Sequence, residues 1–174
     1  TTIGKLSFGD KVMASFFQSV TTRTAGFFTF SQKGMRASTG LICVILMFIG
    51  GSPVGTAGGV KTSTFALVII SAMSAVRGSE YGTAYNRRLP NRTMRKALAV
   101  ILISMTVVLT SVILLLTYNG GDLLDILFET TSAVGTVGLT RDFTTSLNQV
   151  GKMIIITCMY LGRIGPITLA IIFN

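Results

Sequence analysis

Two short Thr-X-Gly tracts, Thr24–Gly26 and Thr136–Gly138, carry residue types suited to backbone chemistry rather than side-chain chemistry. Small residues with glycine let a chain turn its carbonyl oxygens to one side. A row of such oxygens can replace the water shell of a dehydrated alkali metal cation. One tract alone is a weak signal, because any turn can contain it. The tracts predict a cation filter only if the surrounding elements position both of them alike.

The sequence offset that separates the two tracts also aligns a wider repeat. Each copy has a semi-apolar stretch of about 12 residues, the tract, a polar segment and an apolar span, and the stretch is too short to cross a bilayer. It can enter halfway as a helix, and the chain can return as extended backbone that lines water. The aligned pairs are Phe16/Phe128, Ser19/Thr131, Thr24/Thr136, Gly26/Gly138 and Phe27/Leu139.

Each copy therefore predicts a pore loop, in which a half-helix precedes a filter. We place the half-helices at about 10–22 and about 122–134, and the filters at 23–27 and 135–139. The C-terminal end of each half-helix directs its partial negative charge toward the filter, which favours a cation there.

Composition places the chain in a membrane. Its mean hydropathy is +0.68, and 12% of its residues are charged, roughly half the share in soluble domains. Apolar blocks at 37–76, 97–117 and 150–174 predict membrane spans. The first block would form a helix of about 60 Å, twice the roughly 30 Å hydrocarbon core. Because glycines and Pro53 interrupt it, we predict an all-α membrane protein of span–pore-loop–span repeats, with one broken transmembrane helix and an intramembrane loop at 50–60.

The excess of basic residues indicates membrane topology. The formal net charge is +9, but long apolar runs are foreign to nucleic-acid binding proteins. Segment 77–96 holds six Lys and Arg against one acid, so the positive-inside rule makes it a cytoplasmic loop. The filters then face the outside of a multi-pass protein in the cell membrane. Cys43 and Cys158 lie in apolar runs and are predicted to be small buried residues.

A glycine-rich segment and an arginine occupy equivalent depths in the two copies. The shift that places Thr24 on Thr136 also places Gly50 on Gly162 and Gly51 on Arg163. At roughly 6 Å from an ion path and an effective dielectric of about 20, Arg163 would oppose a cation by about 3 kcal/mol. We therefore predict a gate beneath the filter, formed by Gly50, Gly51, Ser52, Pro53, Val54, Gly55, Thr56, Ala57, Gly58, Gly59 and Arg163.

Four motifs, "QSVTTRTAGF", "FIGGSPVGTAGGVKTSTF", "SAVGTVGL" and "MYLGRIGPITLA", together resemble one known family. They are similar to the second half of the Trk/Ktr/HKT superfamily of potassium transporters, closest to the Ktr membrane subunit. Members arrange four span–pore-loop–span repeats around one pore. The resemblance implies that 1–76 is the third repeat without its first span, and that 97–174 is the fourth repeat.

The resemblance also implies an activity and partners. The expected function is potassium uptake across the cell membrane, gated by the glycine-rich loop and Arg163, with no catalysis and no cofactor in this chain. Na⁺ is a candidate activator. Expected partners within the membrane are the missing N-terminal half of the polypeptide, a second copy in a homodimer, and membrane lipid. A cytoplasmic ring of nucleotide-binding regulatory subunits is a further expected partner, which the loop 77–96 could contact. No nucleic acid is expected as a partner. K⁺ would bind the backbone carbonyls of Thr24, Ala25, Gly26, Thr136, Val137 and Gly138.

Two alternative functions are open to a test. The first is a two-repeat potassium channel assembled from copies of this chain. The second, more remote, is a nucleotide-binding enzyme, because Gly55–Thr62 nearly matches the phosphate-binding pattern G-x-x-x-x-G-K-[ST]. Val60 separates Gly59 from Lys61 in that segment, which moves the lysine away from its phosphate.

Other charged residues near the filters and the gate have simpler expected roles. Arg23 is either a fixed outer charge or a buried brace behind the filter, whereas Arg141 is expected on a solvated face. Lys61 is expected to snorkel inward. Arg163 could also pin helices together through carbonyls, which is compatible with gating.

The acids of the second copy lie on its predicted half-helix. Asp122 and Asp125 are expected to favour the positive N-terminal end of that helix electrostatically. Glu129 lies deeper and could pair with an arginine behind the filter.

Overall fold

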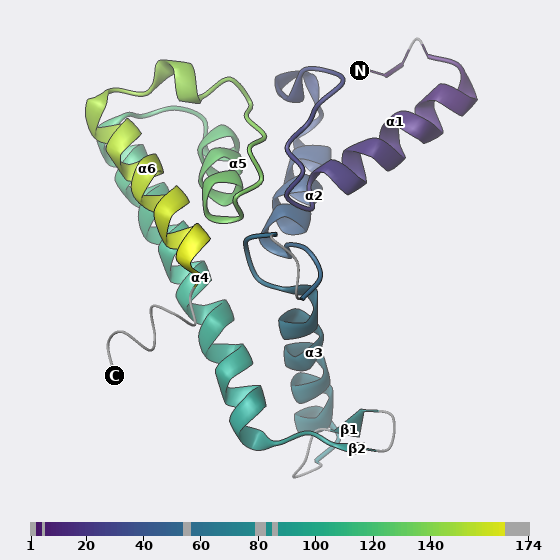
Figure 1. Ribbon diagram of the computed structural model, residues 1–174. Coiled ribbons are helices and arrows are strands. Elements are labelled where there is room, and N and C mark those ends of the chain that lie inside the picture. Colours follow the sequence, from purple (N-terminus) through teal and green to yellow (C-terminus); the bar gives the residue numbers. More distant parts are fainter. Residues whose placement is uncertain (1–2, 5, 54–56, 79–82, 85–86, 166–174) are drawn as a thin grey trace.

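The computed structural model describes residues 3–4, 6–53, 57–78, 83–84 and 87–165, and the fold is helical (Figure 1). The predicted all-α fold is therefore confirmed, with one short hairpin in addition. The helices are α1 (Phe8–Thr21), α2 (Ala37–Phe48), α3 (Thr62–Val76), α4 (Asn91–Tyr118), α5 (Leu123–Val134) and α6 (Gln149–Ile164). The shorter elements are the 3₁₀ turns η1 (Gln32–Gly34) and η2 (Thr144–Ser146) and the antiparallel strands β1 (Thr83–Ala84) and β2 (Arg87–Arg88).

The internal repeat is visible in the backbone. The shift that places Thr24 on Thr136 also places η1 on η2 residue for residue, and the start of α2 on the start of α6. α1, with 14 residues, overlies α5, with 12. Helices of that length rise only about 18–21 Å, less than the thickness of a bilayer core. In both copies a half-length helix leads through non-helical chain and a 3₁₀ turn into an apolar helix.

The apolar block 37–76 forms two helices instead of one. α2 ends at Phe48 and α3 begins at Thr62. The ends of the intervening loop are held together, because Ile49 and Val60 form a parallel bridge and the Gly50 amide donates to the Val60 carbonyl at 2.8 Å. α3 therefore starts close to the point where α2 stops, and the membrane helix is broken as the glycines and proline predicted.

α4 is the long teal helix of Figure 1. Its 28 residues rise about 42 Å, and among the described residues it is the one helix long and apolar enough to cross a membrane by itself. It begins at Asn91, directly after Pro90, whereas hydropathy predicted a span over 97–117. Hydropathy misses the first turns because Arg92 and Arg95 are polar, although arginine is a good helix former.

α5 lies in the middle of the packing, between α2 on one side and α4 and α6 on the other (Figure 1). Eight of its residues are buried, whereas α1 buries only Gln18 and Thr21. One apolar core joins α4, α5 and α6 around Leu115 and Ile126, and a second joins α2 to α5 around Phe128. The second half-helix is thus enclosed by the described chain, and the first is not.

α6 ends at Ile164 and is followed by Gly165 with a φ of 82°. Of the span predicted at 150–174, residues 166–174 lie outside the described residues. Cys158 on α6 and Cys43 on α2 are buried, unbridged thiols, as predicted.

Candidate functional site

Both Thr-X-Gly tracts follow directly on the ends of the half-helices and share an unusual backbone. Thr24 and Gly26 have φ values of 70° and 76°, and Thr136 and Gly138 have 53° and 90°. A positive φ is uncommon for threonine, because its branched side chain crowds the backbone. The residue between each pair is outside this left-handed region, so handedness alternates along each tract. The same pattern of φ signs is present in both copies.

The two tracts lie against one another. A Cβ atom added to Gly26 would be 2.2 Å from the Val137 carbonyl oxygen, and one added to Gly138 would be 3.9 Å from the Gly26 Cα. Glycine at position 26 is therefore required by close packing as well as by its φ. Ala25 and Gly138 are exposed, whereas Val137 is buried. Within the described ranges, no cluster of His, Cys, Asp or Glu could hold a metal.

Hydrogen bonds tie each tract to the end of its half-helix. The amide of Ala25 donates to the Thr21 carbonyl at 3.1 Å, and the amide of Val137 donates to the Ser132 carbonyl at 2.9 Å. The Thr21 hydroxyl donates to the carbonyl of Phe27, just beyond the first tract. The tracts thus start at the C-terminal, partially negative ends of two helices.

The glycine-rich loop lies beneath the second tract. A Cβ atom on Gly58 would be 2.0 Å from the Thr136 Oγ1 and 2.9 Å from the Gly135 carbonyl oxygen, so this glycine is in direct contact with the start of the tract. Ser52 and Pro53 are exposed. Gly51, Ala57 and Gly59 are partly buried, and Gly50 is buried. Val54, Gly55 and Thr56 of the predicted gate lie outside the described residues.

Arg23 connects the first tract to the loop. Its guanidinium donates to the carbonyl of Ile49 and, at 3.3 Å, to that of Gly50. A cation at these carbonyls caps the negative end of α2. Of the two roles considered for Arg23, the contacts favour the brace. The Lys61 ammonium donates to the Ala57 carbonyl within the loop.

Arg163 lies in the last turn of α6 and lines a cavity of about 430 Å³ together with Thr136, Gly138 and Glu129. The helix approaches the second half-helix closely there, because a Cβ atom on Gly162 would be 2.1 Å from the Val134 carbonyl oxygen. The arginine predicted at the gate therefore borders the same cavity as the second tract.

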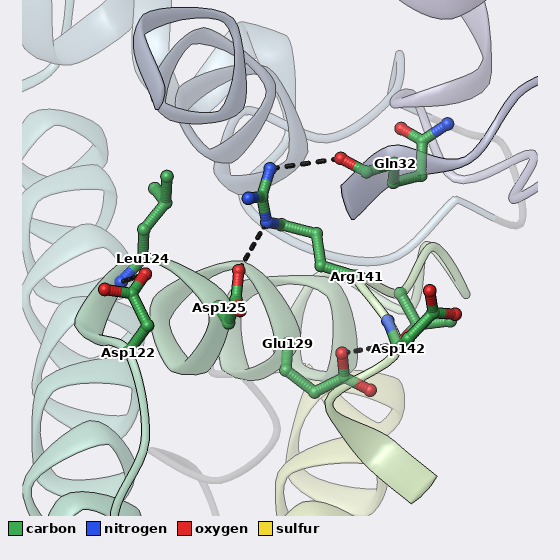
Figure 2. Close-up of polar contacts among 8 residues, drawn as sticks. Gln32, Asp122, Leu124, Asp125, Glu129, Arg141 and Asp142 are labelled. Atoms are coloured by element: carbon green, nitrogen blue, oxygen red, sulfur yellow. Dashed lines mark hydrogen bonds and ion pairs between the residues drawn. The ribbon is translucent and has the colours of Figure 1, made fainter. Parts of the chain in front are cut away.

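Arg141 was predicted on a solvated face, and that prediction is wrong. The residue is only 7% exposed. Its Nε donates to the Asp125 carboxylate at 2.6 Å and its NH1 to the Gln32 carbonyl at 3.1 Å (Figure 2). The guanidinium also lies 5.9 Å from the centre of the Phe128 ring. The cation is buried because a carboxylate, a carbonyl and an aromatic face replace its water.

The acids on and next to α5 meet one expectation and correct another. Asp122 accepts from the Leu124 amide at 3.1 Å as the N-cap of α5, as expected for a helix N-terminus. Asp125 takes the arginine that was considered for Glu129. Glu129 instead accepts hydrogen bonds from the hydroxyls of Thr140, at 2.8 Å, and Thr144. We call this set the outer latch: Asp125, Glu129, Thr140, Arg141 and Thr144.

Sequence reasoning missed the outer latch, although a signal was present. Asp125 and Glu129 are four residues apart, which places them on one face of a helix. Carboxylates on a half-buried helix require partners, and the nearest downstream cation is Arg141. Contact between Gly58 and Thr136 had no signal in the sequence, since it depends on how the loop folds back.

Comparisons with known proteins match this geometry. The family model TrkH, described as a cation transport protein, matches residues 1–174. The Ktr system potassium uptake protein B of Bacillus subtilis (strain 168) is 41% identical over 172 residues, which are 99% of this chain and 39% of that protein. The potassium/sodium uptake protein NtpJ of Enterococcus hirae is 32% identical over 171 residues, 96% of this chain and 38% of that protein.

A solved structure agrees as well. The crystal structure of the potassium transporter TrkH from Vibrio parahaemolyticus matches with a TM-score of 0.80 at 21% identity, over 99% of this chain and 39% of that one. At this identity the match establishes the fold alone. The chain thus spans about two fifths of the length of these relatives.

The family match excludes the nucleotide-binding enzyme suggested by Gly55–Thr62, because the family comprises cation transport proteins and not enzymes. It also confirms the resemblance drawn from the four sequence motifs. The chain is a helical membrane segment that belongs to the TrkH family of cation transport proteins.

Proposed function

We propose that this chain forms half of a pore for potassium uptake, in which backbone carbonyls of the two Thr-X-Gly tracts bind dehydrated K⁺. The observation that carries the proposal is the alternation of positive φ at Thr24 and Gly26, repeated at the equivalent positions Thr136 and Gly138 of the second copy. Carbonyls turned to one side can replace the hydration shell of the ion. The C-terminal ends of α1 and α5 add partial negative charge at the same place.

Two tracts cannot surround an ion, and the packing suggests how the ring is completed. α2, the helix after the first tract, packs on α5, the half-helix of the second copy. If each copy repeats this contact, the exposed apolar side of α6 receives another half-helix, and the exposed side of α1 receives another apolar helix. Met153, Ile156 and Met159 on α6 are each more than half exposed, as are Met13 and Phe16 on α1.

The length of the relatives favours one polypeptide over several copies as the source of the other tracts. The relatives that carry the names of potassium uptake proteins are about two and a half times as long as this chain, since it covers 39% and 38% of them. An N-terminal half in the same polypeptide would supply two further pore loops. The alternative, a channel assembled from copies of this chain alone, would leave that extra length without a role.

We propose the glycine-rich loop 50–59 and Arg163 as the gate below this filter. Gly58 is in contact with Thr136, and Arg163 lines the cavity that Thr136 also lines. A loop in this position would obstruct an ion that leaves the filter, and a positive charge would oppose it electrostatically. The parallel bridge between Ile49 and Val60 joins the two ends of the loop, next to the end of α2 and the start of α3.

We further propose that the filters face outward and that segment 77–96 is cytoplasmic. We also propose that the transporter is a homodimer, and that segment 77–96 contacts a ring of nucleotide-binding regulatory subunits. The positive-inside rule supports the orientation. Reversing the charge of Arg87, Arg88 and Arg92 should abolish co-purification of the two components, because the contact would become repulsive. Complexes that survive this triple reversal would remove the segment from the interface.

The experiment that tests the filter is Gly138→Ser in the complete transporter, reconstituted into liposomes. At a φ of 90° a side chain strains the backbone, so the carbonyls should lose their common direction. We expect the ratio of K⁺ to Na⁺ flux to fall by about tenfold or more. Gly9→Ser is the matched control, since Gly9 lies on α1 with nothing within 4 Å of an added Cβ atom. An unchanged flux ratio in the folded Gly138→Ser protein would contradict the proposal.

A further inference from the structure

Arg141 is a buried cation whose contacts reach into both copies of the repeat. Its partner Asp125 belongs to α5 in the second copy. Its other hydrogen bond ends on the Gln32 carbonyl in η1, which belongs to the first copy. A Cβ atom on Gly40 of α2 would be 3.3 Å from the Arg141 NH1, so the guanidinium also rests on the first copy's apolar helix. Figure 2 shows the side chain between α5 and η1.

The contacts of Arg141 cannot be replaced by those of another cation. The planar fork of arginine donates in two directions at once, here to a carboxylate at 2.6 Å and a carbonyl at 3.1 Å. The guanidinium also lies over the fully buried Phe128 ring. A lysine has the same charge but lacks the planar fork, so its ammonium cannot reproduce the fixed spacing of the two arginine donors.

The rest of the outer latch fixes the same piece of chain. Residues 139–144 run from the second tract toward η2, and Arg141 lies three positions after Gly138. Glu129, one turn beyond Asp125 on α5, holds the hydroxyls of Thr140 and Thr144. The chain that leaves the second tract is therefore tied to α5 at two levels. Among the described residues of the outer latch, Arg141 carries the hydrogen bond to the first copy, and Leu139 beside it packs against apolar residues of that copy.

We infer that Arg141 is a positioning residue for ion selectivity, which fixes the outer end of the second tract relative to the first. The inference rests on the proposed filter and adds a residue that does not touch the ion. A buried ion pair adds little net stability over apolar residues of similar size, but it does define a geometry. Because the two tracts touch at Gly26 and Val137, a shift of the second tract alters the spacing of carbonyls in both.

The experiment measures K⁺ and Na⁺ flux of the complete transporter in liposomes at matched amounts of folded protein. We expect Arg141→Met, Asp125→Asn and Arg141→Lys each to lower the K⁺ to Na⁺ flux ratio by about fivefold or more. Arg141→Lys separates position from charge, since it keeps the positive charge. The double variant Asp125→Asn/Arg141→Met should lose no more than the worse single variant, because both break one contact.

Lys33→Met is the matched control. Lys33 is an exposed cation in η1, next to Gln32, so its removal changes the outer charge but not the latch. Its flux ratio should stay within about twofold of the original. A purely structural role of Arg141 would lower the amount of folded protein and both fluxes together, with the ratio unchanged, and that result would overturn the inference.

Further outcomes are equally decisive. If Arg141→Lys kept the K⁺ to Na⁺ flux ratio of the unchanged transporter, charge and not geometry would be needed. That result also overturns the inference. If Arg141→Met does not fold, Arg141→Lys and Asp125→Asn decide alone. A failure of the filter itself is distinguishable, because then Gly138→Ser would also leave the ratio unchanged.

Discussion

The two copies of the repeat agree in backbone and differ in what surrounds it. Thr24 and Thr136 share a left-handed conformation, and the 3₁₀ turns that follow the tracts occupy equivalent positions in the two copies. Yet the second half-helix is mostly buried, and the first buries two residues. The positions of Asp125 and Glu129 are taken in the first copy by Met13 and Phe17, which are 68% and 38% exposed.

This difference shows that the conformation of a tract and its attachment to the rest of the chain have separate causes. The conformation of each tract is local, since a helix end followed by Thr-X-Gly forms it in an enclosed copy and in an exposed one. The attachment of each tract depends on its neighbours. The second copy uses charged hydrogen bonds to α5, whereas the first uses a neutral pair, in which the Gln18 amide donates to the Gln32 side chain at 2.7 Å. The exposed apolar side of α1 is the side on which we propose that a further helix packs.

The largest effect should come from glycines at equivalent positions of the two copies. Gly162→Ala places a Cβ atom 2.1 Å from the Val134 carbonyl oxygen, between two helices that cannot separate easily. We expect it to lower the free energy of unfolding by about 3 kcal/mol. Gly50→Ala meets the Gly58 carbonyl at 2.2 Å, but that atom belongs to a loop, so we expect a loss below about 1 kcal/mol.

Thermal unfolding in detergent measures both variants. Equal losses would mean that the loop is as rigid as the helix packing, which would contradict the contrast between the two copies.

The next effect tests the loop, which interrupts the first copy, whereas α6 runs unbroken to Ile164. Shortening residues 52–58 should remove the obstruction below the filter and raise K⁺ flux by about tenfold. Flux into liposomes at matched amounts of transporter is the measurement. Unchanged or lost flux in a folded protein would show that the loop supports the pore instead of closing it.

Much of this architecture was predictable from the sequence because it depends on local chemistry. The repeat offset, the half-helices and the break near Pro53 follow from residue type and periodicity. The environment of Arg141 did not, because nothing near it in the sequence shows that Gln32, 109 positions away, supplies a carbonyl. The helix α4 begins before the predicted span 97–117, because hydropathy reports lipid contact and not helix formation. The burial of a charged side chain depends on how the two copies pack together, so it cannot be predicted from the neighbouring sequence.

The smallest effect concerns the neutral pair of the first copy, Gln18 and Gln32, which are 6% and 2% exposed. Gln18→Leu should lower the free energy of unfolding by about 1 kcal/mol, because it leaves the Gln32 side-chain oxygen buried without its partner. Adding Gln32→Leu should restore most of that loss, since two apolar groups then replace two polar ones.

The double variant also sharpens the contrast with the outer latch. Leucine at position 32 keeps the backbone carbonyl that Arg141 uses, so the K⁺ to Na⁺ flux ratio should stay within about twofold of the original. Thermal unfolding and liposome flux together give both values. If the ratio fell as far as in the Arg141 variants, the neutral pair would position the filter as strongly as the ionic one. The two copies would then differ in chemistry but not in function, because attachment of either tract would be enough to set the spacing of both.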